Sequence, residues 1–449
     1  MFELIKKLFR LLFAIAVSKR LYTLLSFVYS YVIEELTVDG TAIRPSKHAK
    51  NNKYTILILS PRAFRKDIDC IVAANEFRVL RLPEHWLSRI IYKFYPGEFA
   101  KYFVGANPGH PDFKHKKEQK ELREFLQKFL KKLYKRIRVN CVISPHCRYV
   151  VDTDWGAVST KMGIPHILIP RDSQLASSHF ELKAEKYMFK NGIPKFEGGH
   201  IIYQSELDRT VYIDTGYAKP ERISCLGCPR MDNFIMKSKK VNRLKNNRRK
   251  KVVFLPFLWG TTFEESDLFA YVCDVHSFFI HFALRYPEID VVIKPKPRYP
   301  GSPQKTALLR PLMGSFIETE KIPNLTVRDD LDLHDLFFET DVVCGLHTSA
   351  LLEAAVIGLP VIIPYFKDLQ NQKYDERLFY REAYDLFDIA EDVKELEMMI
   401  LKRIRNPAID KKVMEGREVL FEEYVSTLKC NATEKYVECI KQVIENQRL

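Results

Sequence analysis

The sequence predicts two α/β domains, each a Rossmann-like arrangement of helices around a parallel β-sheet. Its 449 residues are too many for one ordinary domain, which spans about 100 to 200 residues. The apolar runs 54–60 and 251–255 lack polar alternation, which is typical of strands buried on both faces of a parallel sheet. Residues 116–138 show helical spacing of apolar side chains between the runs 77–82 and 139–144. This alternation of strand and helix predicts βαβ units.

The same patterns divide the chain into four segments. We expect amphipathic helices at 1–45, a first Rossmann-like domain at 50–235, a second at 250–390, and C-terminal helices at 391–449 that pack back on the domains. The turn 227–232 ends the first domain, and its Gly-x-Pro sequence lets the chain change direction. We expect an ion pair between Arg230 and Asp232 to hold this turn.

Net charge narrows the class of binding partners, and cysteine content indicates the redox state of the compartment. The 71 Lys and Arg residues exceed the 57 Asp and Glu residues, and the resulting net charge of +14 favours anionic partners. The sequence contains no helix-turn-helix, RNP or paired zinc-ligand motif, so no nucleic acid is expected as a partner. The nine cysteines are scattered without a secretory signal, which indicates free thiols in a reducing compartment. Cys225 and Cys228 form a CxxC motif without a second ligand pair, so no zinc site is predicted.

The first 36 residues are apolar and basic. Five cations interrupt their apolar runs: Lys6, Lys7, Arg10, Lys19 and Arg20. The longest uncharged stretch, 21–33, is shorter than the ~20 residues that cross a bilayer. Two interpretations remain: helices that pack on the protein's own core, or interfacial helices that lie on anionic lipid. The excess of apolar residues over one buried stripe favours membrane contact, with the protein in the cytoplasm on the inner face of the cell membrane.

Polar residues that follow the strands of the first half are candidates for a site, because ligands of parallel sheets bind beyond the carboxyl ends of the strands. Asp172 follows the predicted strand 166–170 and is the preferred general base, since a carboxylate there can accept a hydroxyl proton. Asp154 and His146 are alternative bases. An Asp in such a position is also an ordinary turn residue or helix N-cap. The remaining candidates on this side are cations: Arg62, Arg171 and Arg230.

A loop with three cations follows the predicted strand 289–293 of the second half. Lys294, Lys296 and Arg298 alternate with prolines, which exclude a helix. Three positive charges at the carboxyl edge of a sheet suit a phosphate or pyrophosphate, whereas a basic solvent loop is the simpler alternative.

The stretch 341–364 predicts a strand, a polar turn, a helix, a Gly-Leu-Pro turn and a second strand. Gly345 would let a ligand approach the backbone, and Thr348 or Ser349 would cap the helix, whose first amides can face an anion. Glu353 follows about one turn later and is a candidate acceptor for ribose hydroxyls. Thr-Ser is also an ordinary N-cap and Glu an ordinary surface residue, so the prediction rests on their combination after a strand.

Two further features belong to the same stretch. His347 is a candidate donor to a phosphate or to a leaving group. Residues 367–381 are polar and aromatic, and we expect them to fold over the ligand.

Three motifs match one known pattern in order and spacing. They are Thr348-Ser349, Glu353-Ala354, Gly358 and Pro360 within the stretch 341–364; the lysines and prolines of 294–297; and the turn 227–232. Together they resemble the GT-B glycosyltransferases, especially those related to bacterial capsule and surface-polysaccharide enzymes, and more remotely CDP-glycerol transferases and UDP-N-acetylglucosamine 2-epimerases. Lys296 stands where the family has a His, and a Lys there would keep the charge and lose proton transfer.

The resemblance implies two Rossmann-like domains that face each other across a cleft. It implies transfer of a sugar from a nucleotide-sugar donor to a glycan or lipid-linked acceptor in surface polysaccharide biosynthesis, without a metal and without a cofactor. Taking the resemblance together with the positions after strands, we expect three groups of site residues. Asp172 and His347 are the expected catalytic residues; Lys294, Lys296, Arg298, Thr348, Ser349 and Glu353 the donor residues; and Arg62, His146, Asp154, Arg171 and Arg230 the acceptor or cleft residues.

Two other functions remain open. A transferase of glycerol or ribitol phosphate from a CDP-alcohol would use the same cations, although Lys296 counts against it because histidines are expected in the phosphate loop. A non-catalytic membrane scaffold on the same fold is the second alternative, because the usual His is missing.

Overall fold

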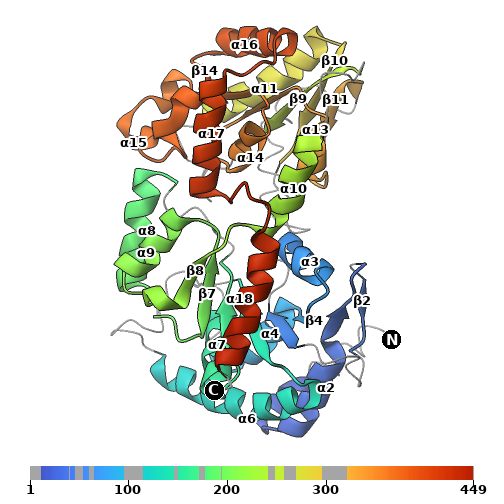
Figure 1. The fold of residues 1–449 in the computed structure, drawn as a ribbon, viewed down its shortest axis with the longest axis vertical. Coiled ribbons are helices and arrows are strands. Elements are labelled where there is room, and N and C mark those ends of the chain that lie inside the picture. Colours follow the sequence, from blue (N-terminus) through green and yellow to red (C-terminus); the bar gives the residue numbers. More distant parts are fainter. Residues whose placement is uncertain are drawn as a thin grey trace. The chain divides into compact units, whose positions relative to one another are not determined.

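A computed structural model describes residues 12–39, 41–45, 54–59, 65–95, 115–145, 150–170, 177–193, 195–240, 248–256, 269–295 and 321–447. The chain separates into two compact α/β units (Figure 1). Unit 1 comprises Met1–Leu175, Lys183–Asp232 and Lys429–Leu449, and unit 2 comprises Ala176–Leu182 and Asn233–Leu428. The predicted fold class is therefore confirmed in its central feature, two α/β domains with parallel sheets.

Unit 1 is built on an eight-stranded sheet of order β2-β1-β4-β3-β5-β6-β7-β8. Its strands are β1 (Glu34–Leu36), β2 (Ala42–Ile43), β3 (Thr55–Leu59), β4 (Arg78–Leu82), β5 (Cys141–Ser144), β6 (His166–Leu168), β7 (His200–Tyr203) and β8 (Ile223–Cys225). Strands β3 to β8 are parallel to one another, and every residue of β3 and β5 is buried. Helices cover both faces of the sheet, and burial on both faces is the reason why these strands are continuous apolar runs in the sequence.

The antiparallel edge of this sheet departs from the prediction that residues 1–45 are helical. Strand β1 pairs with β4 and with β2, so the described residues 34–43 are not a helix. Two ion pairs join β1 to β4: Glu35 binds Arg78 at 2.9 Å and Glu34 binds Arg81 at 2.5 Å. The prediction failed here because the partners of these glutamates lie more than forty residues further along the chain.

Two apolar layers cover the sheet of unit 1. The helices of the unit are α2 (Tyr22–Val32), α3 (Arg65–Ala73), α4 (Glu84–Ile91), α6 (Lys116–Ile137), α7 (Val150–Lys161), α8 (His179–Asn191), α9 (Glu206–Asp214), the first turn of α10 (Pro229–Lys240) and α18 (Ala432–Asn446), with the 3-10 turn η2 (Pro220–Arg222). Helices α2, α4, α6 and α7 share one core with Leu57 and Leu80. Helices α3 and α18 share the other with Ile56 and Ile58. Alternate residues of β3 thus enter opposite cores, as the pleat of a strand requires.

Unit 2 is built on a six-stranded parallel sheet of order β11-β10-β9-β12-β13-β14. Its strands are β9 (Lys250–Leu255), β10 (Ile289–Ile293), β11 (Leu325–Val327), β12 (Val342–Gly345), β13 (Val361–Pro364) and β14 (Asp388–Ala390). Counted from β9, the order is 3-2-1-4-5-6, which is the Rossmann order. The helical elements are α11 (Phe269–Arg285), α13 (Leu333–Phe338), α14 (Ala350–Val356), η6 (Lys367–Leu369), α15 (Gln372–Asp375), η7 (Arg381–Leu386), α16 (Val393–Arg405) and α17 (Lys411–Tyr424).

The turn at 227–232 is held differently from the prediction. Arg230 does not pair with Asp232; its guanidinium binds Asp67 of α3 at 2.9 Å, and its backbone N–H donates to the same carboxylate at 3.2 Å. Asp232 is buried and accepts hydrogen bonds from the backbone N–H groups of Ala432 at 3.1 Å and Thr433 at 2.8 Å. These are the first amides of α18, so Asp232 supplies the N-terminal cap of the helix that returns to unit 1.

Replacement of this cap should destabilise unit 1. We expect Asp232→Ala to lower the free energy of unfolding by about 2 kcal/mol, because two amides of α18, one buried and one half-buried, lose their acceptor. Hydrogen exchange of residues 432–446 and urea unfolding measure the effect. Asp410→Ala is the control, since exposed Asp410 accepts from one amide of α17, that of Lys412. Equal losses in the two variants would contradict the role of Asp232.

Candidate functional site

The strand order of unit 2 defines one position where a ligand is expected. In a sheet of this order, ligands bind beyond the carboxyl ends of the strands, at the switch point between the first and fourth strands. These are β9 and β12, which pair from Val342 opposite Val252 to Gly345 opposite Leu255. The turn 346–349 and Lys294, which directly follows β10, therefore lie at the edge where a nucleotide is expected.

Gly345 allows close packing at this switch point because it has no side chain. A Cβ added to it would lie 3.1 Å from the carbonyl oxygen of Leu255 and 3.2 Å from a methyl group of Leu351. The absent side chain thus lets β12 and the following helix approach β9. The prediction that Gly345 opens the backbone to a ligand is not supported, because protein atoms already occupy this space.

His347 lies just beyond Gly345 in a left-handed backbone conformation, with a φ of 53°. Its ring contacts the ring of Phe379, and the two centroids are 3.7 Å apart. Phe379 belongs to the segment 367–381, so this polar and aromatic segment packs beside the candidate site. Left-handed backbone costs a residue with a Cβ about 1 to 2 kcal/mol, and such strain concentrates at functional sites.

Helix α14 begins directly after this turn and is short. Thr348 is buried, and its hydroxyl accepts from the N–H of Ala350 at 3.4 Å. Ser349 occupies the N-cap position, but its side chain makes no capping hydrogen bond. Of the two predicted caps, Thr348 is therefore the one that contacts an amide of the helix start.

Glu353 is held inside unit 2 by a histidine that the sequence did not single out. Its carboxylate lies 2.9 Å from Nε2 of His334, and both side chains are largely buried. The His334 ring stacks on Phe234 with a centroid distance of 4.1 Å. A ribose at Glu353 would therefore meet a carboxylate that His334 already orients. One signal in the sequence could have pointed to His334. Asp332 caps α13 through the amides of His334 and Asp335, and it marks the start of a helix beside the site.

Lys294 is buried at the carboxyl end of β10. Its backbone N–H donates to the carbonyl of Phe254 at 2.9 Å, which places it level with the end of β9. Gly345 lies at the same level on the other side of β9, so the two backbones are about 10 Å apart, twice the spacing of neighbouring strands. Lys296 and Arg298, the other two cations of the predicted loop, lie outside the described residues.

Unit 1 shows fewer of the predicted residues. Arg62, His146, Arg171 and Asp172 lie outside the described residues. Arg230 is described, and it binds Asp67 as given above.

Asp154 is described and fully buried on α7. Its carboxylate accepts from Arg123 at 2.6 Å, from Gln119 at 2.9 Å and from Tyr95 at 3.3 Å. Burial raises the pKa of Asp154, and the Arg123 guanidinium opposes that rise. A buried charge needs such partners to remain ionised, so these contacts explain Asp154 as a structural residue. The acceptor role predicted for it gains no support.

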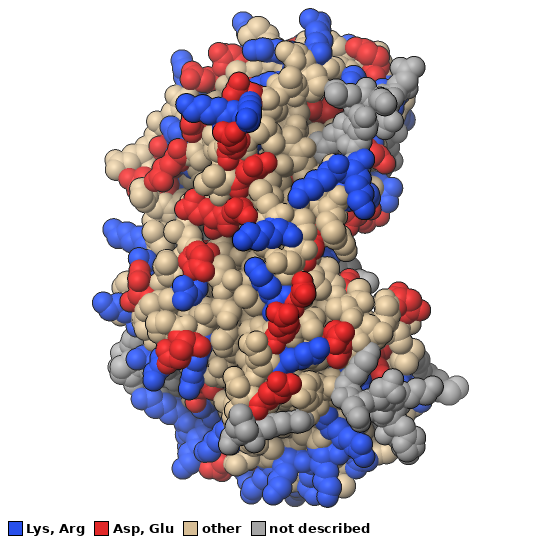
Figure 2. Space-filling view, viewed as in Figure 1, with Lys and Arg blue, Asp and Glu red and all other residues tan. Residues whose placement is uncertain are grey.

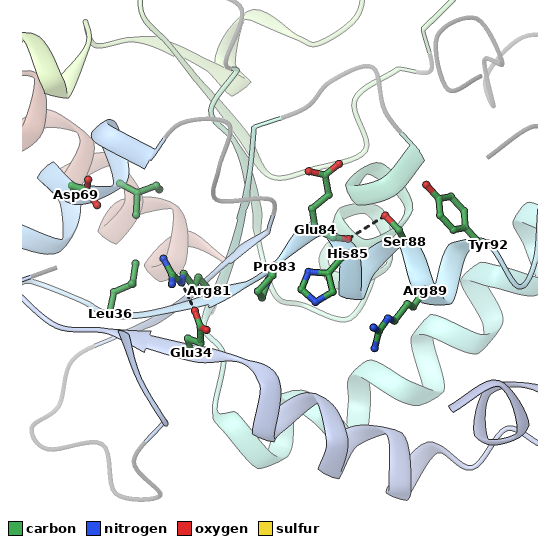
Figure 3. Close-up of a pocket in the computed structure, with 11 residues that line it drawn as sticks. Glu34, Leu36, Asp69, Arg81, Pro83, Glu84, His85, Ser88, Arg89 and Tyr92 are labelled. Atoms are coloured by element: carbon green, nitrogen blue, oxygen red, sulfur yellow. Dashed lines mark hydrogen bonds and ion pairs between the residues drawn. The ribbon is translucent and has the colours of Figure 1, made fainter. Parts of the chain in front are cut away.

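An open pocket of about 700 Å³ lies at the carboxyl end of β4 in unit 1 (Figure 3). Its lining includes Glu84, His85 and Ser88 of α4, and Arg81, which is bound to Glu34 of β1. Figure 3 shows His85 and Glu84 on the first turn of α4, with Ser88 and Tyr92 further along the helix. Neither Glu84 nor His85 was predicted as a site residue; the available signal was their position just after the predicted strand 77–82, beyond Pro83.

No metal centre is present in the part of the chain that the structure describes, since no three His, Cys, Asp or Glu side chains there are placed to hold an ion. Of the helices described, none combines the length and apolar character needed to cross a bilayer.

Comparison with known proteins gives structural likeness without sequence likeness. No family model and no curated protein matches the chain. Solved structures that resemble it include the UDP-GlcNAc 2-epimerase of Neisseria meningitidis bound to UDP-GlcNAc, with 12% identity, 86% of this chain and 100% of that chain covered, and a TM-score of 0.47. The glycotransferase of kitacinnamycin has 12% identity, coverage of 88% and 100%, and a TM-score of 0.44. The wall teichoic acid polymerase TagF has 12% identity, coverage of 86% and 98%, and a TM-score of 0.43. Likeness of this size assigns neither a family nor a reaction.

The left-handed backbone at His347 can be tested by two substitutions. His347→Gly and His347→Ala both remove the contact with Phe379, so their difference reports only the backbone. We expect the Gly variant to be more stable by about 1 kcal/mol, because Gly adopts a positive φ without steric cost. Urea unfolding measures this difference.

Ala350 provides the matched control for this pair. It lies in the first turn of α14, where Gly should be less stable than Ala. If the Ala and Gly variants at position 347 are equally stable, the left-handed backbone conformation assigned to His347 is wrong.

Proposed function

We propose that unit 2 binds a nucleotide-activated donor at the carboxyl edge of its sheet, and that the protein transfers the sugar of this donor to a glycan or lipid-linked acceptor. One observation carries the proposal. The Rossmann order of the sheet sets Lys294 and the turn 346–349 on either side of the end of β9, at the switch point.

The donor phosphates would be bound by Lys294 together with Lys296 and Arg298. Lys294 suits this role because a lysine ammonium forms charge-assisted hydrogen bonds with phosphate oxygens, and its burial holds it at the end of β10. Negative charge develops on the phosphate as the sugar leaves, and fixed cations stabilise that charge. Thr348, Ser349 and the start of α14 would lie beside the same group.

The nucleoside would be bound by Glu353, with His334 as its positioning residue. The hydrogen bond from His334 fixes one side of the carboxylate, and ribose hydroxyls would donate to it as well. His347 would donate to a phosphate or to the leaving group, from a ring that Phe379 holds in place.

The acceptor would be bound by unit 1. The pocket beside β4 offers carboxylates, cations and His85 to the hydroxyl groups of a glycan. Asp172 remains the proposed general base. Arg62, His146 and Arg171 belong to the same proposal, which rests on their positions after strands of the sequence.

The nucleotide product distinguishes this reaction from its alternatives. Purified protein is incubated with a panel of nucleotide sugars and of CDP-alcohols, and the products are identified by mass spectrometry. Sugar transfer from a nucleoside-diphosphate sugar releases a nucleoside diphosphate. Transfer of glycerol or ribitol phosphate releases CMP, and a non-catalytic scaffold releases neither. Absence of both binding and release would defeat the proposal.

Donor binding should depend on Lys294 and Glu353. We expect Lys294→Ala to weaken nucleotide binding tenfold or more, since a charged hydrogen bond contributes about 1.5 to 3 kcal/mol. Glu353→Gln should weaken it less than Glu353→Ala, because an amide still has an oxygen for a donor. Isothermal titration calorimetry measures the dissociation constants. Lys402→Ala replaces an exposed lysine of α16 and is the control, which should bind as the unaltered protein does.

Two substitutions in unit 1 should affect acceptor binding and turnover separately. We expect His85→Ala to raise the KM for the acceptor with donor affinity unchanged, and Asp172→Ala to lower kcat with donor affinity unchanged. Steady-state kinetics with the donor found above measures both. His281→Ala, an exposed histidine of α11, is the control. Full turnover in Asp172→Ala would disprove the assignment of the base.

A further inference from the structure

The outer face of α2 carries large apolar side chains that solvent reaches. Leu24, Phe27 and Tyr31 are 49%, 56% and 54% exposed, and their spacing places them on one side of the helix. Leu25 and Tyr29 on the other side are buried in the core of unit 1. Helix α2 contains no charged residue, although a surface helix ordinarily has a polar outer face. Packing on the core therefore explains why one face of α2 is apolar, but it does not explain why the exposed face is apolar as well.

Exposed apolar side chains also occur in the chain just before α2. Leu12, Ile15 and Leu21 are also exposed, while Phe13 and Val17 between them are buried. We name the exposed set the apolar face; it consists of Leu12, Ile15, Leu21, Leu24, Phe27 and Tyr31.

Helix α6 carries the complementary feature. Its second half has no acidic residue, and the exposed side chains from there to its C-cap residue Arg138 are Gln127 and six cations. We name these cations the basic face; they are Lys128, Lys131, Lys132, Lys135, Arg136 and Arg138. Within the described parts of the chain, none of the six forms an ion pair with a carboxylate. No carboxylate among the described residues therefore accounts for the accumulation of these charges.

The two faces adjoin each other. Helix α2 packs against α6. The guanidinium of Arg136 lies 5.7 Å from the ring centroid of Phe27, which links the basic face to the apolar face. Figure 2 shows Lys and Arg gathered at the lower end of the view, where Figure 1 places α6. One side of unit 1 therefore presents apolar side chains next to positive charges that form no ion pair with a described carboxylate.

We infer that the apolar face and the basic face together form a docking surface for an anionic lipid bilayer. Apolar side chains enter the boundary between headgroups and acyl chains, and lysines reach the phosphates beside them. Each Lys or Arg near such a surface raises the partition coefficient about fivefold. The inference deepens the proposed function, because this surface would hold the enzyme beside a lipid-linked acceptor. It assigns the electrostatic part to α6, a helix far along the chain from the N-terminal segment.

Vesicle flotation tests the basic face. The full chain is mixed with vesicles of phosphatidylcholine, with and without one third phosphatidylglycerol. We expect binding to the anionic vesicles that weakens as salt is added. The triple variant Lys131→Ala, Lys132→Ala, Lys135→Ala should bind about a hundredfold more weakly. The triple variant Lys402→Ala, Lys411→Ala, Lys412→Ala loses the same charge from unit 2 and should bind as before.

Replacement of exposed apolar residues tests the apolar face. Phe27→Ser with Tyr31→Ser should abolish flotation without loss of folding, because both side chains are exposed. Met398→Ser with Val419→Ser removes equally exposed apolar side chains from unit 2 and is the control. Binding retained in both test variants, or binding that does not depend on anionic lipid, overturns the inference. A dimer in sedimentation that Phe27→Ser dissociates also overturns it, since a second copy then covers the face. The assay contains no nucleotide, so its failure is distinct from failure of the transfer reaction.

Discussion

The pairing of β9 with β12 is the contact on which the arrangement of unit 2 depends. These strands are separated in sequence by β10 and β11, so the chain crosses to the other side of β9 before β12 begins. Their ends come together because Gly345 has no side chain, and any Cβ would press on the carbonyl of Leu255. That closeness sets Lys294 on one side of β9 and the turn 346–349 on the other. The candidate donor site is thus a consequence of strand order, to which individual residues add charge and hydrogen bonds.

Buried carboxylates follow a second constraint in both units. A carboxylate removed from water is costly unless positive charge or hydrogen-bond donors surround it. Asp67 is bound by Arg230, Asp154 by Arg123, and Glu353 by His334. The first two of these contacts hold helices of unit 1 in place. Arg230 and Asp154 were candidates for a site, and in the structure each forms an ion pair that compensates a buried charge. Glu353 differs because its partner lies beside the switch point, where one contact can serve both folding and binding.

Of the two interpretations of the N-terminal segment, the structure supports packing on the core, and membrane contact stays a proposal. One face of α2 belongs to the core, where Tyr29 donates to the carbonyl of Trp86 at 2.7 Å. The opposite face is exposed and equally apolar, as a helix placed between a protein core and a lipid surface would need to be. Packing against α6 brings this face beside lysines that are distant in the sequence.

The sequence by itself determined the class of fold and the position of most elements. Its apolar runs predicted β3, β9 and β12, and helical spacing predicted α6 within one residue, because burial on two faces and the period of a helix both leave local patterns. The structure alone decided the order of the strands, the pairing of Asp232 with the start of α18, and the contact of Glu353 with His334. It likewise brought the cations of α6 to the apolar face of α2. These contacts join residues far apart in the chain, and they depend on packing and charge compensation that no local period records.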